Sequence, residues 1–210
     1  MVPKGLYGCH GCQPVVTGFT QQMRIGIGYD IHRFDGPPRE MAPQKGAKAA
    51  ISRGKRPLKL GGVVVPFPRG LAGHSDADVL LHAIADALLG AIGAPDLGEQ
   101  FPPGNPRHRN ADSRTFVRAA YDQVRRQGWV VGNVDATVIA DAPKLVGYKG
   151  AMCRTISRLL EIPAAQVSVK AKTTEGFGPG KDGVAVHAVV LLQPARRARR
   201  LRTTRGSSRR

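Results

Sequence analysis

The stretch that decides the fold is GHSDADVLLHAIADALLGAI, residues 73–92. From Val79 onward it consists mostly of Ala, Leu, Ile and Val, which predicts a helix that is apolar on most sides and therefore buried. Ser75 is expected to be the N-cap of this helix. Asp76 and Asp78 are expected in its first turn, where the helix dipole favours negative charge.

An imidazole in a buried helix needs a polar partner, and His82 is such a group. His82 shares one helix face with Asp78 and Asp86, which lie four residues before and after it. The two acids fit a role in capping backbone groups or supporting the histidine. The simplest interpretation of His82 is a core histidine that hydrogen-bonds to a carbonyl group.

A second group of residues favours a metal site instead. The segment RIGIGYDIH, residues 24–32, reads as a strand, and Asp30 and His32 project from the same face of it. With His82 they would supply three nitrogen and oxygen ligands. That is the usual protein share of a catalytic zinc ion, whose fourth position is left for water or substrate. The spacing leaves open whether the strand and the helix meet.

The remaining elements follow from periodicity and from glycine and proline positions. Further strands are predicted at residues 60–66, 129–140, 166–172 and 183–192, and further helices at residues 112–127 and about 141–160. This order predicts an α+β single domain in which helices cover one face of a mixed sheet.

The charge of the chain is unevenly distributed. The net charge is +17, and residues 36–59 hold seven Lys or Arg against one Glu, while residues 196–210 hold eight Arg and no acid. Such runs are typical of solvated loops and tails, and they are also compatible with weak binding to nucleic acid. They contain no aromatic residues, which single-strand binding would favour.

One domain is expected over residues 23–193, because 210 residues are enough for a single sizeable core. Residues 1–22 are interpreted as a disordered leader, 36–57 as a flexible basic insertion and 194–210 as a basic disordered tail. Cys9 and Cys12 form a C-x-x-C pair in the leader, without the second pair of a structural zinc site. With neither a signal peptide nor a run of transmembrane length, a cytoplasmic protein is expected.

Three loops could converge on a ligand. Residues 172–175 offer two hydroxyls for phosphate oxygens and a carboxylate for a divalent cation, or they form an ordinary polar hairpin loop. Residues 96–98 could hold a ribose or could be a helix-terminating turn. Residues 140–145 could present backbone groups to a base or could be a capping turn.

Eight motifs in order along residues 23–193 carry a resemblance to a known family. They are RIGIGYDIHRF at 24–34, GHSDADVLLHA at 73–83, DALLG at 86–90, DLG at 96–98, ADSR at 111–114, NVDAT at 133–137, APK at 142–144 and KTTE at 172–175. Taken together they resemble the 2-C-methyl-D-erythritol 2,4-cyclodiphosphate synthases of the non-mevalonate isoprenoid pathway.

The resemblance implies a homotrimer with active sites between subunits and a cytidine diphosphate substrate. The family cyclises 4-diphosphocytidyl-2-C-methyl-D-erythritol 2-phosphate and releases CMP, when the 2-phosphate attacks the β-phosphorus. By resemblance, Asp30, His32 and His82 bind Zn²⁺ or another divalent cation. Glu175 matches the ligand of a second ion, Mg²⁺ or Mn²⁺, which bridges the diphosphate.

The resemblance also implies roles for residues around these ions. His74 and Thr173 match the groups that stabilise the transition state, Asp96 and Gly98 match the ribose site, and residues 140–145 match the cytosine pocket. The positions implied in substrate binding are Asp30, His32, His74, Ser75, Asp96, Gly98, Ala140, Ala142, Pro143, Lys144, Leu145, Lys172, Thr173, Thr174, Glu175, Phe177 and Lys181.

The chain departs from the family pattern at two loops. The family often has Asp where Pro103 and Asn105 stand, in a loop that touches the methylerythritol part of the substrate. The loop after Glu175 is shorter than in many members and lacks an arginine that commonly contacts the diphosphate. Lys181 is expected to replace it, as a point charge without the bidentate fork.

Two rival functions remain open. A zinc hydrolase could use the same three ligands to activate water, but no H-E-x-x-H or comparable motif supplies a general base. A nucleic-acid-binding protein would exploit the basic charge, with binding that weakens steeply with salt and is lost with residues 194–210.

Overall fold

The computed structural model describes residues 22–35, 56–102, 104–108, 110–177 and 181–195. Most of the expected leader, with Cys9 and Cys12, of the insertion and of the tail lies outside the described residues, as does Pro103. The helices are α1 (Val79–Ala91), α2 (Leu97–Gln100), α3 (Ser113–Arg126) and α4 (Lys149–Leu159), with 3₁₀ turns at Pro106–His108 and Ala164–Gln166. The strands are β1 (Arg24–Arg33), β2 (Leu58–Leu60), β3 (Val63–Val65), β4 (Trp129–Ile139), β5 (Val167–Lys172) and β6 (Gly183–Pro194).

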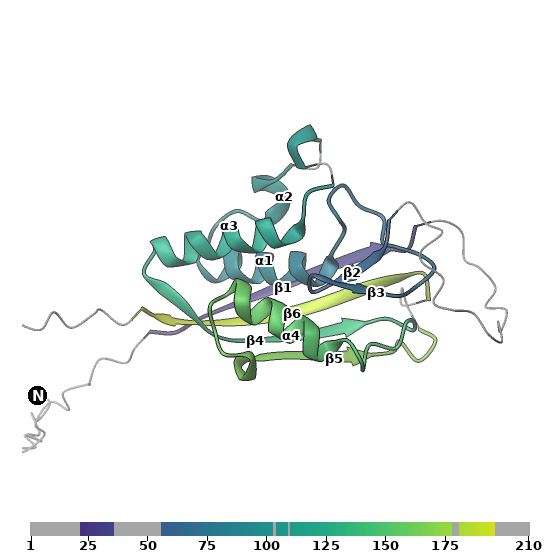
Figure 1. Cartoon of the computed structure of the whole chain (residues 1–210). Coiled ribbons are helices and arrows are strands. Elements are labelled where there is room, and N and C mark those ends of the chain that lie inside the picture. Colours follow the sequence, from purple (N-terminus) through teal and green to yellow (C-terminus); the bar gives the residue numbers. More distant parts are fainter. Residues whose placement is uncertain (1–21, 36–55, 103, 109, 178–180, 196–210) are drawn as a thin grey trace, which may run out of the picture.

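The fold is the expected α+β domain with a mixed sheet. The sheet has the strand order β1-β6-β4-β5, and helices cover one of its faces (Figure 1). β6 pairs antiparallel with β1 and with β4, while β4 pairs parallel with β5. β1, β4 and β5 therefore run in one direction and end at the same edge of the sheet, where the segments that follow them can hold functional groups.

Helix α1 lies against β1 so closely that only glycine fits between them. A Cβ atom on Gly26 would lie 1.8 Å from the carbonyl oxygen of Ala87, and one on Gly28 would lie 1.9 Å from that of Ala83. Both distances are far below van der Waals contact. The two glycines thus let the helix backbone rest directly on the strand, which brings the next side chains of β1 close to α1.

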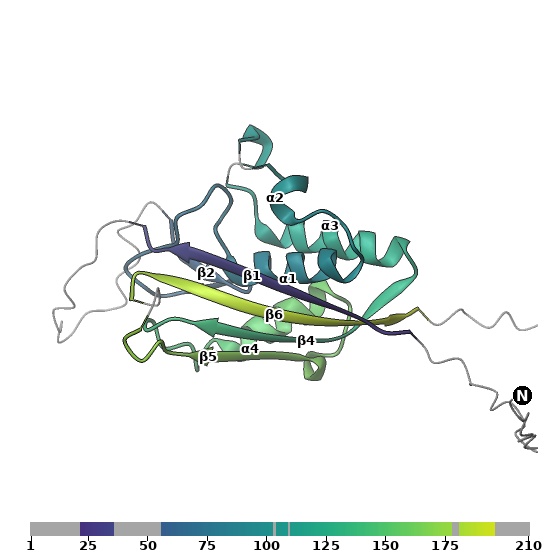
Figure 2. The same ribbon diagram turned by 180° about the vertical axis from the view of Figure 1, so that it is seen from behind.

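The two faces of β1 differ in composition because side chains alternate along a strand. Towards α1 the strand presents Gly26, Gly28, Asp30 and His32, and towards the opposite face it presents Ile25, Ile27, Tyr29 and Ile31. On that opposite face Ile25 is 66% and Ile27 68% exposed. Figure 2 shows this face of the sheet without helices over it. We call it the open face.

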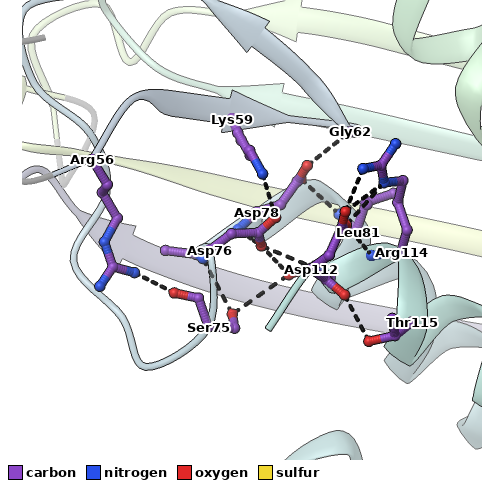
Figure 3. A network of polar contacts seen from close by, with 12 residues as sticks. Arg56, Lys59, Gly62, Ser75, Asp76, Asp78, Leu81, Asp112, Arg114 and Thr115 are labelled. Carbon is purple, nitrogen blue, oxygen red and sulfur yellow. Dashed lines mark hydrogen bonds and ion pairs between the residues drawn. The ribbon is translucent and has the colours of Figure 1, made fainter. Parts of the chain in front are cut away.

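The expected N-cap of the central helix is wrong. Asp78, not Ser75, caps α1, and its Oδ1 accepts the backbone N–H of Leu81 at 3.1 Å. The Asp78 carboxylate also accepts the N–H groups of Gly61 and Gly62, at 2.8 and 2.6 Å, and so ties the helix start to the turn between β2 and β3 (Figure 3). This fully buried carboxylate has more backbone donors within reach than Ser75 could serve. Asp76 accordingly lies before the helix rather than in its first turn.

Two other element boundaries differ from the prediction. The single strand expected at residues 60–66 is a hairpin of β2 and β3, because Gly61 and Gly62 adopt φ of +61° and +73° and form a two-residue turn. The helix expected from about residue 141 begins only at Lys149. Asp141 does not start it, since its carboxylate accepts hydrogen bonds from Thr174 in the neighbouring loop.

The remaining elements agree with the prediction. α3 begins after Asp112, whose side chain accepts the N–H of Arg114, and it ends just before Gly128. β4, β5 and β6 occupy the expected segments within two residues at each end. The capping role expected for Asp86 is also confirmed, because its Oδ1 accepts the N–H of Leu97 at 2.8 Å.

Candidate functional site

Asp30 and His32 on β1 lie next to His82 on α1, near the end of the strand. Asp30 Oδ2 lies 3.0 Å from His32 Nε2 and 3.1 Å from His82 Nδ1. Ligand atoms of these three residues all lie within 4.8 Å of one another, close enough to surround one ion. The close approach of α1 to β1 over the two glycines produces this geometry. The ring nitrogens of His82 face Asp30 and the hydroxyls of Ser75 and Ser113 rather than a carbonyl group, so the interpretation as a carbonyl-bonded core histidine is wrong.

Asp30 and His32 are each oriented by a hydrogen bond on the side that faces away from the group. Asp30 Oδ1 accepts the N–H of Ile31 at 2.8 Å, which leaves Oδ2 facing the histidines. His32 Nδ1 lies 2.6 Å from the carbonyl oxygen of Ala72 and must donate to it, so Nε2 is the ring nitrogen left to face the group. One carboxylate oxygen and two imidazole nitrogens are ligands that zinc and other divalent cations accept. These residues therefore fit a divalent cation.

The electrostatics of the group reflect this closeness. Burial raises the pKa of the Asp30 carboxyl, but hydrogen bonds and charge from His32 and His82 outweigh it and hold that pKa well below its ordinary value. Burial lowers the pKa of His32, but the hydrogen bond and charge of Asp30 outweigh it and raise that pKa. The pair therefore favours an ionised carboxylate, the form that binds a cation.

A cavity of about 950 Å³ is lined by Arg56, Lys59, Gly73, His74, Asp76 and Asn105, among others. It adjoins the group through Gly73, where a Cβ atom would lie 3.0 Å from Cε1 of His32. His74, expected to stabilise the transition state, thus faces this space. Lys59 Nζ lies 3.2 Å from Asp76 Oδ2, and Arg56 donates to the carbonyl oxygen of Ser75 (Figure 3). The sequence did not single out Arg56 or Lys59, which stand in a basic run that resembles a solvated loop.

The loops after β4 and β5 form a second group at the same sheet edge. Asp141 accepts the N–H and the hydroxyl of Thr174, at 2.8 and 2.9 Å. The hydroxyl of Thr173 donates to Glu175, and Ala140 donates its N–H to the carbonyl oxygen of Lys172. The expected cytosine and diphosphate segments, residues 140–145 and 172–175, are thus bonded to each other. Within them Leu145 is buried, whereas Lys144 and Glu175 are exposed.

The remaining expected site residues are more scattered. Asp96 caps α2, where it accepts the N–H of Glu99, and Gly98 lies within that helix, so this motif begins a helix instead of ending one. Phe177 is 81% exposed and Lys181 is also exposed. Ser75 is buried, with its Oγ 3.1 Å from His82 Nε2.

One chain does not bring the two groups together. Asp30 and His32 end β1, while Thr173 and Glu175 follow β5, and β6 and β4 lie between these strands. Three inter-strand spacings amount to about 14 Å, too far for both groups to contact one diphosphate. A site that uses both needs a second chain.

Sequence reasoning missed one buried residue beside the histidine. Ser113 Oγ lies 2.9 Å from His82 Nε2. Ser113 belongs to the ADSR motif at residues 111–114, and in the sequence it stands at the start of the helix predicted at residues 112–127. A serine that is completely buried at the first position of a helix signals a polar partner, but burial is not visible in the sequence.

The comparisons with known proteins concern most of the chain. A family model described as YgbB family matches residues 23–193. The 2-C-methyl-D-erythritol 2,4-cyclodiphosphate synthase of Geobacillus thermodenitrificans is 47% identical over 173 residues, covering 81% of this chain and 96% of that protein. The enzyme of the same name from Shouchella clausii is 48% identical over 175 residues, covering 82% and 99%. A solved CDP complex of IspF from Plasmodium falciparum has a TM-score of 0.66 at 33% identity, covering 83% of this chain and 98% of that one.

None of the helices in the described ranges is both long and apolar enough to span a lipid bilayer.

Proposed function

Because this chain belongs to the YgbB family and is an enzyme of the 2-C-methyl-D-erythritol 2,4-cyclodiphosphate synthase class, we propose that it cyclises 4-diphosphocytidyl-2-C-methyl-D-erythritol 2-phosphate with release of CMP. The observation that carries the proposal is the convergence of Asp30, His32 and His82 beside a cavity that His74 lines. The 2-phosphate attacks the β-phosphorus, the new P–O bond forms, and the bond to the CMP oxygen breaks. No water is consumed.

A divalent cation held by Asp30, His32 and His82 would neutralise phosphate charge and align the reacting groups, as phosphoryl transfer requires. Zn²⁺ suits this set of ligands best. His74 lines the cavity beside these ligands and would donate to a phosphate oxygen as negative charge develops. Arg56 and Lys59 add positive charge to the same space and favour an anionic substrate.

The cytidine diphosphate end of the substrate would lie on the second group. The hydroxyl of Thr173 and the carboxylate of Glu175 lie side by side, so Glu175 can hold a Mg²⁺ or Mn²⁺ ion next to a hydroxyl that contacts the diphosphate. Backbone groups of residues 140–145 would contact the cytosine, and Asp96 the ribose. Relatives support this assignment, since the Plasmodium falciparum structure is a complex with CDP.

The chain would act as a homotrimer whose active sites lie between subunits. Two observations support this proposal. The separation of about 14 Å between the two groups requires a neighbouring chain to complete a site. The open face also exposes a row of apolar residues on β1 that an assembly would bury, as Ile25 and Ile27 are about two-thirds exposed.

The decisive experiment measures CMP release with Zn²⁺ and Mg²⁺ present and identifies the second product by phosphorus NMR. We expect equimolar CMP and cyclic diphosphate, and we expect both to be lost in His82→Ala. Release of inorganic phosphate would favour a zinc hydrolase instead. A folded, zinc-loaded trimer that yields no CMP would mean that the changes at Pro103 and Asn105 or the shortened loop after Glu175 have abolished this activity.

A further inference from the structure

A chain of polar contacts runs inward from His82, away from the proposed cation. On the outer side of the ring, Nδ1 faces Asp30. On the inner side, Nε2 lies 2.9 Å from Ser113 Oγ and 3.1 Å from Ser75 Oγ. Ser113 is completely buried, and its hydroxyl and its backbone N–H both point to Oδ1 of Asp76, the latter at 3.3 Å.

The proton of Ser113 decides which way the hydrogen bond behind His82 runs. An ionised carboxylate accepts hydrogen bonds and cannot donate them, so the single hydroxyl proton of Ser113 is directed to Asp76. The Ser113 oxygen then has only lone pairs to offer to His82 Nε2. Nε2 must therefore carry a proton and donate it to Ser113, so the ring nitrogen left to serve as the ligand is Nδ1, which faces Asp30 and His32.

The carboxylate of Asp76 is itself held in place. The second carboxylate oxygen of Asp76 lies 3.2 Å from Lys59 Nζ (Figure 3). The backbone N–H of Asp76 donates to the carbonyl oxygen of Ala111 at 3.0 Å, one residue before the N-cap of α3. The segment before α1 and the start of α3 are thus fastened to each other at this point. The start of α3 thereby places Ser113 behind the histidine.

Ser75 cannot fix the ring in the same way. Its hydroxyl oxygen accepts the N–H of Ala77 at 3.1 Å, and within the described residues its own proton can be donated to Ser113 Oγ at 3.5 Å or to Nε2 itself. A hydroxyl with a free proton can serve either form of the imidazole. Only Ser113, whose proton is directed to Asp76, therefore favours one protonation form of the imidazole over the other.

We propose that Ser113, engaged by Asp76, is a positioning residue that holds His82 in the form protonated at Nε2 and so presents Nδ1 as a ligand. This inference rests on the proposed metal site formed by Asp30, His32 and His82. Partners behind a metal-bound histidine typically change metal affinity by about 10- to 100-fold. Ser113 would therefore act on the cation through His82, without touching substrate.

The first test compares Zn²⁺ affinity, by competition with a chelator, in the wild-type protein and in Ser113→Ala. The matched control is Ser157→Ala, which removes another buried serine hydroxyl, one that donates to the carbonyl oxygen of Arg154 in α4, away from the site. We expect Ser113→Ala to weaken zinc binding by about 10- to 100-fold and the control to leave it within about twofold. The absorption bands of bound Co²⁺ should shift in Ser113→Ala alone, because the ring is no longer held.

A second pair of variants applies if Ser113→Ala does not fold. In Asp76→Asn the amide oxygen can still accept the Ser113 proton, so zinc affinity should stay close to that of the wild type. In Asp76→Ala that proton is free to be donated to Nε2, and affinity should fall. NMR of the zinc-loaded wild type should also find the proton of His82 on Nε2, identified by its loss in His82→Ala.

The outcomes separate the two hypotheses. If the wild-type protein binds no zinc, the proposed metal site is wrong. If it binds zinc but Ser113→Ala binds equally well, or Asp76→Ala and Asp76→Asn have equal affinities, or the His82 proton lies on Nδ1, the role given to Ser113 is wrong.

Discussion

At the scale of the residue, every side chain of the proposed metal site makes a hydrogen bond on the side that faces away from the ion. The N–H of Ile31 holds Asp30, the carbonyl oxygen of Ala72 holds His32, and the hydroxyl of Ser113 holds His82. Such contacts leave one atom of each side chain to face the ion. The site is therefore preorganised, and binding a cation would require little rearrangement.

Replacing Asp30 by Asn removes the one negative ligand and leaves its size unchanged. Zinc affinity should fall by more than about 100-fold, beyond the effect of an outer partner, and CMP release should fall with it. The matched control is Asp122→Asn, which changes an exposed aspartate on α3. Zinc content after dialysis and CMP release measure both effects, and a zinc-replete Asp30→Asn enzyme would contradict the assigned ligand.

The stability of the metal-free protein should depend on pH through His32. Its pKa is raised above the ordinary value because, although burial lowers it, the hydrogen bond and charge of Asp30 outweigh burial. Charged His32 thus stabilises the fold fully below about pH 6.5, and this contribution is lost as the pH rises through the higher folded-state pKa. Thermal denaturation with a chelator should show a falling Tm above about pH 6.5, and His32→Gln should flatten that slope. A Tm that rises over this range would contradict the account.

At the scale of the element, the strand β1 and the helix α1 could be predicted because each is long and has a clear pattern. Their meeting could not be predicted, since no periodicity states which helix lies on which strand. The N-cap at Asp78 and the late start of α4 depend on contacts with Gly62 and Thr174, far along the chain. For Asp30, His32 and His82, the residue types sufficed to suggest a metal site, whereas Ser113 needed its burial to be known.

The close contact of β1 with α1 makes Gly28→Ala a sensitive change. The new Cβ would meet the carbonyl oxygen of Ala83 at 1.9 Å, so the helix must shift away from the strand. We expect a loss of about 1–3 kcal/mol in the free energy of unfolding, or more, as for overpacked cores. Since His82 lies on the displaced helix, zinc affinity should fall as well.

Gly147→Ala is the control for this change, because a Cβ there has no atom within 4 Å. Urea denaturation and chelator competition measure the two effects. If Gly28→Ala were as stable as Gly147→Ala, the helix would not lie as close to the strand as described.

At the scale of the whole molecule, the open face and the separation of the two groups are the observations behind the proposed assembly. The sequence indicated an α+β domain, but the trimer entered only through resemblance. The isoleucines of β1 look like ordinary strand residues in the sequence. Alternation shows that they share one face of the strand, but it does not show that this face is exposed. The sheet order was needed to see that β1 and β5 are the two outer strands of the sheet, with β6 and β4 between them.

Ile27→Glu should separate the subunits. Ile27 is 68% exposed on the open face, so a carboxylate there leaves the single chain folded but cannot be buried in an interface without a large cost. Analytical ultracentrifugation should show smaller species and CMP release should be lost, while zinc still binds. Val64→Glu, at an apolar residue that is 54% exposed on β3, should change neither assembly nor activity. An active trimer of Ile27→Glu would place the interface elsewhere.

The alternation of β1 has a consequence for how the chain can change in length. Glycines 26 and 28, Asp30 and His32 all depend on the same parity, so inserting or deleting one residue between Gly28 and Asp30 would turn both ligands to the open face and send isoleucine and tyrosine towards α1 or the ion. Only changes of two residues preserve the parity, and those would slide the ligands along the helix, away from His82. The length of the segment from Gly26 to His32 is therefore fixed: a substitution on the open face leaves both ligands in place, whereas a change of length does not.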